Sequence, residues 1–212
     1  MAAPITPWSV PRSRTPREWG PALAAGCTMV VKPASATPYS ALAMAELAVR
    51  VGIPAGVFNV VTGSARRIGN EITSNPLVRK LSFTGSTAVG LQLATQCGPT
   101  LKRTSMELGG NAPFIVFDDA DMDKAVTMAM GCKFRNAGQT CICANRFLVQ
   151  NNVVEAFTTN LLDHITALRV GDGLKPETDM GPLINADAVA HTDALVKDAV
   201  EKGAQLLFGG KP

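Results

Sequence analysis

Histidines and long apolar runs are scarce in this sequence, and each scarcity argues against a class of function. The 212 residues include two histidines, His164 and His191, and a single tyrosine. Because neither histidine stands at ligand spacing from a cysteine, we expect no zinc site, and a Cys-His or Ser-His-Asp catalytic site is poorly supplied. Charged residues interrupt the apolar stretches, and none approaches the roughly 20 apolar residues that a membrane helix needs.

The sequence also has neither a strong excess of one charge nor the regular, even-numbered cysteine pattern of a disulfide framework. The formal net charge is +3, both signs are spread along the chain, and no basic stripe suggests a nucleic-acid partner. Four prolines and no apolar core in the first twenty residues argue against a secretory signal and against an amphipathic helix there. An odd number of irregularly spaced cysteines favours a reducing, cytoplasmic setting over a disulfide framework; they are Cys27, Cys97, Cys132, Cys141 and Cys143.

The first half of the chain alternates short apolar segments with helical patterns. The sequence predicts strands over residues 28–31, 57–61 and 80–84. It predicts helices over 38–51, 65–74 and 86–93, the first capped by Thr37 and the last opened by Ser86. Strands that alternate with helices across short loops favour an α/β fold with a parallel sheet.

The alternation restarts after Glu107, so we place a boundary between two α/β units near residues 108–110. Asp119 or Asp121 can cap the first helix of the second unit, which ends at Lys133. The predicted strands of this unit are residues 114–117, 147–149 and 206–208, and its later helices are 153–168 and 186–202.

Cys141 is the first candidate for chemistry. Its neighbours from Asn136 to Asn145 are mostly small or polar, whereas a core cysteine usually sits among apolar residues. It falls between a predicted helix and a predicted strand, where functional residues concentrate. The sequence therefore predicts a thiol nucleophile, with a buried loop cysteine as the alternative.

Glu107 and the turn at Gly85-Ser86 are two further candidates. Glu107 stands between Met106 and Leu108, and a carboxylate in an apolar pocket makes a good general base. The alternative is a strand residue whose carboxylate faces water. Gly85-Ser86 joins a predicted strand to a predicted helix, where free N–H groups can bind phosphate; the alternative is a glycine turn that only connects the two elements.

Together these runs resemble the NAD(P)-dependent aldehyde dehydrogenase superfamily. Val30-Val31-Lys32-Pro33-Ala34, Phe83-Thr84-Gly85-Ser86, Glu107 and Gly138-Gln139-Thr140-Cys141 occur in the family's order and spacing, and the resemblance extends from about residue 20 to 212. Residues 106–123 and 133–146 are most similar to the succinate-semialdehyde dehydrogenase branch. The resemblance implies a partial Rossmann-like dinucleotide-binding domain over 1–108 and a partial α/β catalytic domain over 109–212, incomplete at both ends.

The resemblance also implies a mechanism. Cys141 attacks the aldehyde carbon, hydride passes to a nicotinamide, and Glu107 activates the water that hydrolyses the resulting thioester. Ser86 and its helix would hold the cofactor's pyrophosphate and Lys32 its adenosine ribose. Gly63 and Gly85 would allow the cofactor to approach the backbone closely.

Cofactor and substrate preferences are implied as well. The family often has glutamate where Ser35 stands; a carboxylate there repels a 2′-phosphate, so Ser35 beside Lys32 favours NADP, with NAD as the alternative. Arg135 is expected to bind the distal carboxylate of a semialdehyde through its forked guanidinium; the alternative is a surface arginine favoured by the dipole at a helix end. Arg17 aligns with a second such arginine, although its surroundings do not match.

Cys143 and Ser9 raise separate questions. Cys143 could form a reversible disulfide with Cys141 under oxidation, or it packs beside the site as a small side chain. Ser9 occupies the position of a family asparagine that donates to the oxyanion, and losing such a donor costs about a hundredfold in rate. Residues 9–19 differ from the family throughout while keeping its length, as compensating frame shifts in a gene would produce.

The resulting hypothesis is an NADP-dependent succinate-semialdehyde dehydrogenase fragment that acts on a small-molecule substrate without nucleic acid or membrane. Glutarate semialdehyde or another short semialdehyde is an alternative substrate. A non-catalytic remnant is the alternative from a different class, favoured by Ser9 and opposed by Cys141 and Glu107. The resemblance implies that the full-length parent is a homo-oligomer, a dimer or a tetramer.

Overall fold

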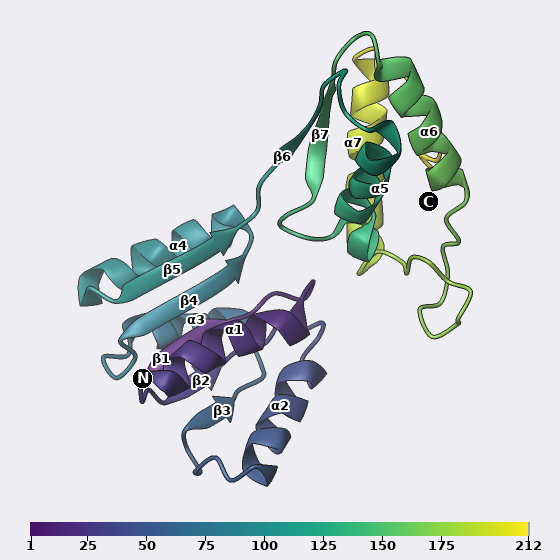
Figure 1. Ribbon diagram of the computed structural model, residues 1–212. Coiled ribbons are helices and arrows are strands. Elements are labelled where there is room, and N and C mark those ends of the chain that lie inside the picture. The colour runs from purple at the N-terminus through teal and green to yellow at the C-terminus, as the bar shows by residue number, and fades with distance from the viewer. Residues whose placement is uncertain (212) are drawn as a thin grey trace. The chain divides into compact units, whose positions relative to one another are not determined.

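A computed structural model describes residues 1–211, which fold as two compact units, residues 1–109 and 110–211 (Figure 1). Both units combine parallel strands with helices, which confirms the predicted α/β class. Within residues 1–211, no helix is long and apolar enough to cross a membrane.

The first unit is built on one parallel sheet of five strands. Its order is β3-β2-β1-β4-β5, so the first strand along the chain lies in the middle. The register pairs Ile5 with Phe83 and Met29 with Phe58. The strands are β1 (Ala2–Ile5), β2 (Met29–Val31), β3 (Phe58–Val60), β4 (Lys80–Gly85) and β5 (Arg103–Leu108).

Helices cover both faces of this sheet (Figure 1). On one face, α1 (Pro11–Ala24) and α2 (Tyr39–Arg50) bury a cluster of residues that includes Met29, Val31 and Phe58. On the other, α3 (Ala65–Ser74) and α4 (Thr87–Cys97) bury a cluster that includes Leu81, Phe83 and Leu93. A short 3₁₀ turn, η1 (Gly98–Thr100), leads into β5. The two apolar clusters hold the strands of the sheet in place from both sides.

The helix α1 contradicts the expectation that prolines exclude a helix in this region. Pro11 stands at the first helical turn, where its missing N–H costs nothing, and Pro16 and Pro21 lie inside the helix. Packing offsets their cost: the ring of Trp19 stacks on Phe58 with centroids 4.7 Å apart. Tertiary contact thus overrides local propensity here.

The first unit departs from the prediction at four further points: β1 and β5 were not predicted, α4 extends to Cys97 rather than to residue 93, and the cap of α2 differs. Ser86 caps α4, since its hydroxyl accepts a hydrogen bond from the N–H of Val89. Thr37 was wrongly assigned as the cap of α2: Pro38 occupies that position, and the Thr37 hydroxyl donates to the carbonyl of Trp8 instead. The Thr37 hydroxyl therefore bonds to a backbone carbonyl far away in the sequence instead of capping the helix that follows it.

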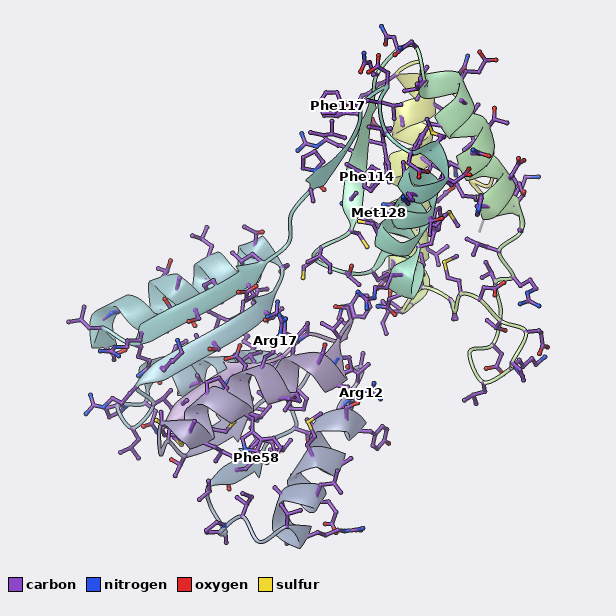
Figure 2. The ribbon with its side chains drawn as sticks, in the orientation of Figure 1. Arg12, Arg17, Phe58, Phe114, Phe117 and Met128 are labelled. Atoms are coloured by element: carbon purple, nitrogen blue, oxygen red, sulfur yellow. The ribbon has the colours of Figure 1, made fainter. Side chains whose placement is uncertain are left out.

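The second unit contains two parallel strands and three helices. Its strands are β6 (Ala112–Val116) and β7 (Ala144–Val149); its helices are α5 (Met122–Lys133), α6 (Val154–Thr166) and α7 (Ala186–Glu201), with a 3₁₀ turn η2 (Arg135–Gly138) after α5. Asp121, rather than Asp119, caps α5 by accepting from the N–H of Lys124. Val116, Val126, Ala129 and Phe157 form the buried core of the unit. Phe114 of β6 packs against this core (Figure 2).

The predicted strand over residues 206–208 is wrong. These three residues form no regular structure, and each is more than half exposed. Within residues 1–211 they pair with no strand, and an apolar run without a backbone partner does not form a ladder.

Leu81 tests the core of the first unit. Its side chain is fully buried in β4, so Leu81→Ala leaves a cavity and is expected to lower the free energy of unfolding by about 2–5 kcal/mol. Urea unfolding followed by circular dichroism measures the loss. Leu91→Ala is the control, because Leu91 on the neighbouring helix α4 is 69% exposed; an equal loss in both variants would contradict the assignment of the core.

Candidate functional site

The first unit gathers the predicted cofactor residues at one edge of its sheet. Parallel strands end on the same side, so the segments after β1, β2, β3 and β4 meet there. The segment after β1 holds Ser9 and the segment after β2 holds Lys32, which makes a parallel bridge to Ile5. Gly63 follows β3, and Ser86 follows β4. The strand order reverses between β1 and β4, and open α/β sheets bind ligands outside such a point.

Lys32 is the buried cation of this edge. Lys32 is 4% exposed, and this burial lowers the pKa of its ammonium group. Its Nζ donates to the hydroxyl of Ser35 at 3.5 Å, the long limit of a hydrogen bond. A desolvated ammonium with so weak a partner gains from an anion or a ribose hydroxyl placed within reach.

The start of α4 offers a second polar feature. The first N–H groups of a helix have no intrahelical acceptor and carry a partial positive charge. The oxygen of Ser86 already accepts from Val89, which leaves its hydroxyl proton free to be donated. Such a terminus, following a parallel strand, is chemically suited to a phosphate group.

Gly63 and Gly85 are required by the backbone and by packing. Gly63 has φ +137°, a conformation that other residues rarely adopt. A Cβ on Gly85 would lie 2.5 Å from Cζ of Phe83, so a larger residue would displace that buried ring. Both glycines therefore have structural reasons to be present, and their predicted closeness to a cofactor stays a prediction.

Glu107 lies near the end of β5 and is held by Arg14, a residue that the sequence reasoning missed. Arg14 Nη2 donates to Glu107 Oε2 at 3.0 Å. The Glu107 side chain is 57% exposed, so within this unit its carboxylate is paired and hydrated rather than enclosed in an apolar pocket. No local motif predicts this pairing, because Arg14 lies 93 residues from Glu107 in the sequence. Arg14 also belongs to α1, a helix that was not predicted because of its prolines.

Cys141 follows an unusual turn in the second unit. Asn136 and Ala137 have φ of 53° and 54°, and Gly138 has φ +74°, so three consecutive residues are left-handed. Left-handed non-glycine residues carry strain and cluster at functional sites. A Cβ on Gly138 would lie 3.2 Å from the carbonyl oxygen of Lys133, which explains the glycine at this position.

Gln139 holds that turn in place. Its Oε1 accepts from the N–H of Ile184 at 2.9 Å, and its Nε2 donates to the carbonyl of Asn136 at 3.1 Å. The thiol of Cys141 follows two residues later and is partly exposed. The chain thus presents this cysteine on a braced loop between η2 and β7 rather than in the core.

Cys143 is packed, unlike Cys141. It is 1% exposed, and its Sγ lies 2.8 Å from the hydroxyl oxygen of Thr140. Both cysteines are free thiols in this structure. These contacts favour the packing interpretation, and a redox pair with Cys141 stays a prediction.

The two arginines proposed for substrate binding lie in different settings. Arg135 is exposed at the start of η2, directly after the last turn of α5. Arg17 lies on α1 (Figure 2) and lines a pocket of about 510 Å³ with Met1, Ala2 and Lys80. Those partners mark the amino edge of the sheet, so the first unit does not bring Arg17 together with Ser9 or Lys32.

Comparison with known proteins gives consistent matches along the chain. The sequence pattern of the Aldehyde dehydrogenase family matches residues 1–212. The succinate-semialdehyde dehydrogenase [NADP(+)] GabD of Escherichia coli K12 is 62% identical over 211 residues, and a glutarate-semialdehyde dehydrogenase of Pseudomonas aeruginosa is 59% identical over 212. The crystal structure of an E. coli NADP dependent enzyme has a TM-score of 0.98 at 62% identity and covers 99% of this chain. The chain spans 44% of the length of each of these three proteins.

Cysteine labelling tests the contrast between Cys141 and Cys143. We expect iodoacetamide to modify Cys141 in the native protein and to spare Cys143, because the second thiol is closed off by packing. Peptide mass spectrometry measures each site, and a urea-denatured sample, in which all five cysteines should react, is the control. Equal native labelling of both thiols would contradict the packing described here.

Proposed function

Since the chain belongs to the aldehyde dehydrogenase family, we propose that it serves the oxidation of an aldehyde to a carboxylic acid with Cys141 as nucleophile. The observation that carries this proposal is the loop of Cys141, a partly exposed thiol that follows three left-handed residues. Because the chain spans less than half of the relatives it matches, the activity is proposed for the protein that contains it.

The first chemical step is addition of the thiol to the aldehyde. The Cys141 thiolate forms an S–C bond to the carbonyl carbon, and the carbonyl π electrons move to oxygen, giving a thiohemiacetal. Ser9 and the backbone N–H of Cys141 are the proposed donors to that oxygen. A serine hydroxyl is shorter than an asparagine amide, and a slow addition step would follow if it fails to reach.

A nicotinamide cofactor, when bound, supplies the acceptor for the hydride that leaves the former aldehyde carbon as the thioester forms. Glu107 then takes a proton from water, the hydroxide adds to the thioester carbon, and the C–S bond breaks. The Cys141 thiolate leaves as the carboxylic acid forms, the acid ionises to the carboxylate, and Glu107 returns its proton to solvent. Water supplies the oxygen atom, and the cofactor leaves reduced by two electrons.

Four residues of the sheet's carboxyl edge are proposed to hold the cofactor. Ser86 and the N–H groups of α4 suit the pyrophosphate, and Gly63 keeps the neighbouring loop free of a side chain. Buried Lys32 suits the adenosine ribose or its phosphate. Neutral Ser35 beside Lys32 supports NADP over NAD, as does the fact that two relatives are named as NADP-dependent.

The proposed substrate is succinate semialdehyde, with glutarate semialdehyde as the second candidate. Two relatives of nearly equal identity are named for these two compounds, which are short aldehydes that end in a carboxylate. Arg135 is proposed to bind that carboxylate through two parallel N–H donors. The difference of one methylene is worth only about 1–3 kcal/mol in a pocket, so discrimination between the two substrates is expected to be modest.

An assay of the protein purified from its gene tests the function. With NADP, we expect reduced cofactor to form from succinate semialdehyde faster than from an uncharged aldehyde of equal length. Cys141→Ser removes the thiolate and is expected to abolish turnover, whereas the matched change Cys27→Ser alters an exposed thiol and leaves turnover intact. A Cys141→Ser variant with normal turnover, or a wild type inactive with every aldehyde, would refute the proposal.

Ser35 tests the cofactor preference. Ser35→Glu introduces a carboxylate three residues from Lys32, which would repel a 2′-phosphate and accept from a 2′-hydroxyl. We expect kcat/KM with NADP to fall about tenfold or more relative to NAD. Ser35→Gln, of similar size without the charge, is the control. A wild type that prefers NAD more than tenfold would contradict the assignment.

A further inference from the structure

The guanidinium of Arg14 is nearly buried in the first unit, although nothing in the proposed chemistry uses it. Its side chain is 11% exposed and comes from the first turns of α1. Burying a guanidinium is costly unless hydrogen bonds and an opposite charge compensate. The carboxylate that Arg14 reaches is that of Glu107, at 3.0 Å.

This ion pair joins helix α1 to strand β5. Glu107 belongs to the edge strand β5, while α1 packs on the apolar cluster that includes β2 and β3. Trp19, on the same helix, stacks on Phe58 of β3. Helix α1 therefore contacts one edge strand, β3, through Trp19 and the opposite edge strand, β5, through Arg14.

The two partners of the pair differ in how firmly they are held. The backbone of Arg14 is part of α1, where its N–H donates to the carbonyl of Val10 at 3.1 Å. Glu107 has a long, half-exposed side chain that carries several rotatable bonds. Arg14 is buried and fixed on a helix, whereas the Glu107 side chain is exposed. The hydrogen bond to Oε2 therefore restricts Glu107 more than it restricts Arg14.

We propose that Arg14 is a positioning residue that orients Glu107 for activation of the hydrolytic water. The inference rests on the proposed function, since it gives Glu107 the role of general base. Arg14 touches neither substrate nor cofactor in this account; it fixes one carboxylate oxygen and so limits the directions in which the other can point. Thioester hydrolysis depends on Arg14, and the preceding oxidation does not.

First-turnover kinetics separate these two steps. Mixing the protein with NADP and succinate semialdehyde reports the oxidation as reduced cofactor, and rapid acid quenching reports release of succinate. Arg14→Met is expected to slow acid release about tenfold, because displaced catalytic groups lose rate steeply, while the first-turnover formation of reduced cofactor is unchanged. Arg14→Lys, which keeps a charged donor, is expected to recover part of the loss. Arg12→Met makes the same change at an exposed position of α1 and should leave both rates unchanged.

A double variant shows whether Arg14 acts through Glu107. In a Glu107→Gln background, adding Arg14→Met should slow acid release no further. The inference is overturned if Arg14→Met leaves acid release unchanged, if it slows oxidation equally, or if its effect persists undiminished in the Glu107→Gln background. A wild type without any aldehyde oxidation overturns the proposed function and this inference together, whereas an active wild type with a normal Arg14→Met variant overturns this inference alone.

Discussion

The central strand β1 determines where the proposed cofactor-binding residues of the first unit gather. It pairs in parallel with β2 on one side and β4 on the other, so it fixes the direction of every other strand in the sheet. Parallel pairing brings all five carboxyl ends to one edge. Residues as far apart in sequence as Lys32 and Ser86 reach that edge for the same geometric reason.

In the second unit, a left-handed turn and the hydrogen bonds of Gln139 position the candidate nucleophile Cys141. Three left-handed residues turn the chain sharply after α5, and hydrogen bonds from Gln139 hold the turn. The left-handed conformation of Asn136 is accompanied by two hydrogen bonds to Gln139, one donated by Asn136 Nδ2 to the Gln139 carbonyl and one accepted by the Asn136 carbonyl from Gln139 Nε2. The first unit thus gathers the residues proposed to bind a cofactor, and the second holds the proposed nucleophile on a hydrogen-bonded loop.

Local signals in the sequence predicted most of the elements of the fold. The bounds of α3 agree residue for residue, and Ser86 caps α4 as its position before a helical pattern suggested. The apolar alternation also predicted the parallel sheet. These features depend on residues close together in the chain, which is why one sequence is enough to find them.

Features that depend on distant partners could not be predicted. The helix α1 survives its internal prolines because Trp19 finds Phe58, 39 positions later in the numbering. Thr37 leaves its helix to bind Trp8, and residues 206–208 lack a strand to pair with. The pairing of Arg14 with Glu107 has the same character: motifs identified the carboxylate, and only the fold revealed the cation that holds it.

The side chain of Gln139 has a consequence for which residues the cysteine loop tolerates. Its amide uses both of its ends, one as acceptor from Ile184 and the other as donor to Asn136. A glutamate of the same shape could accept but could not donate, and its charge would face the carbonyl of Asn136. The loop therefore selects for an amide by its chemical polarity as well as by its size, and a residue two positions from the thiol can be irreplaceable without taking part in any reaction.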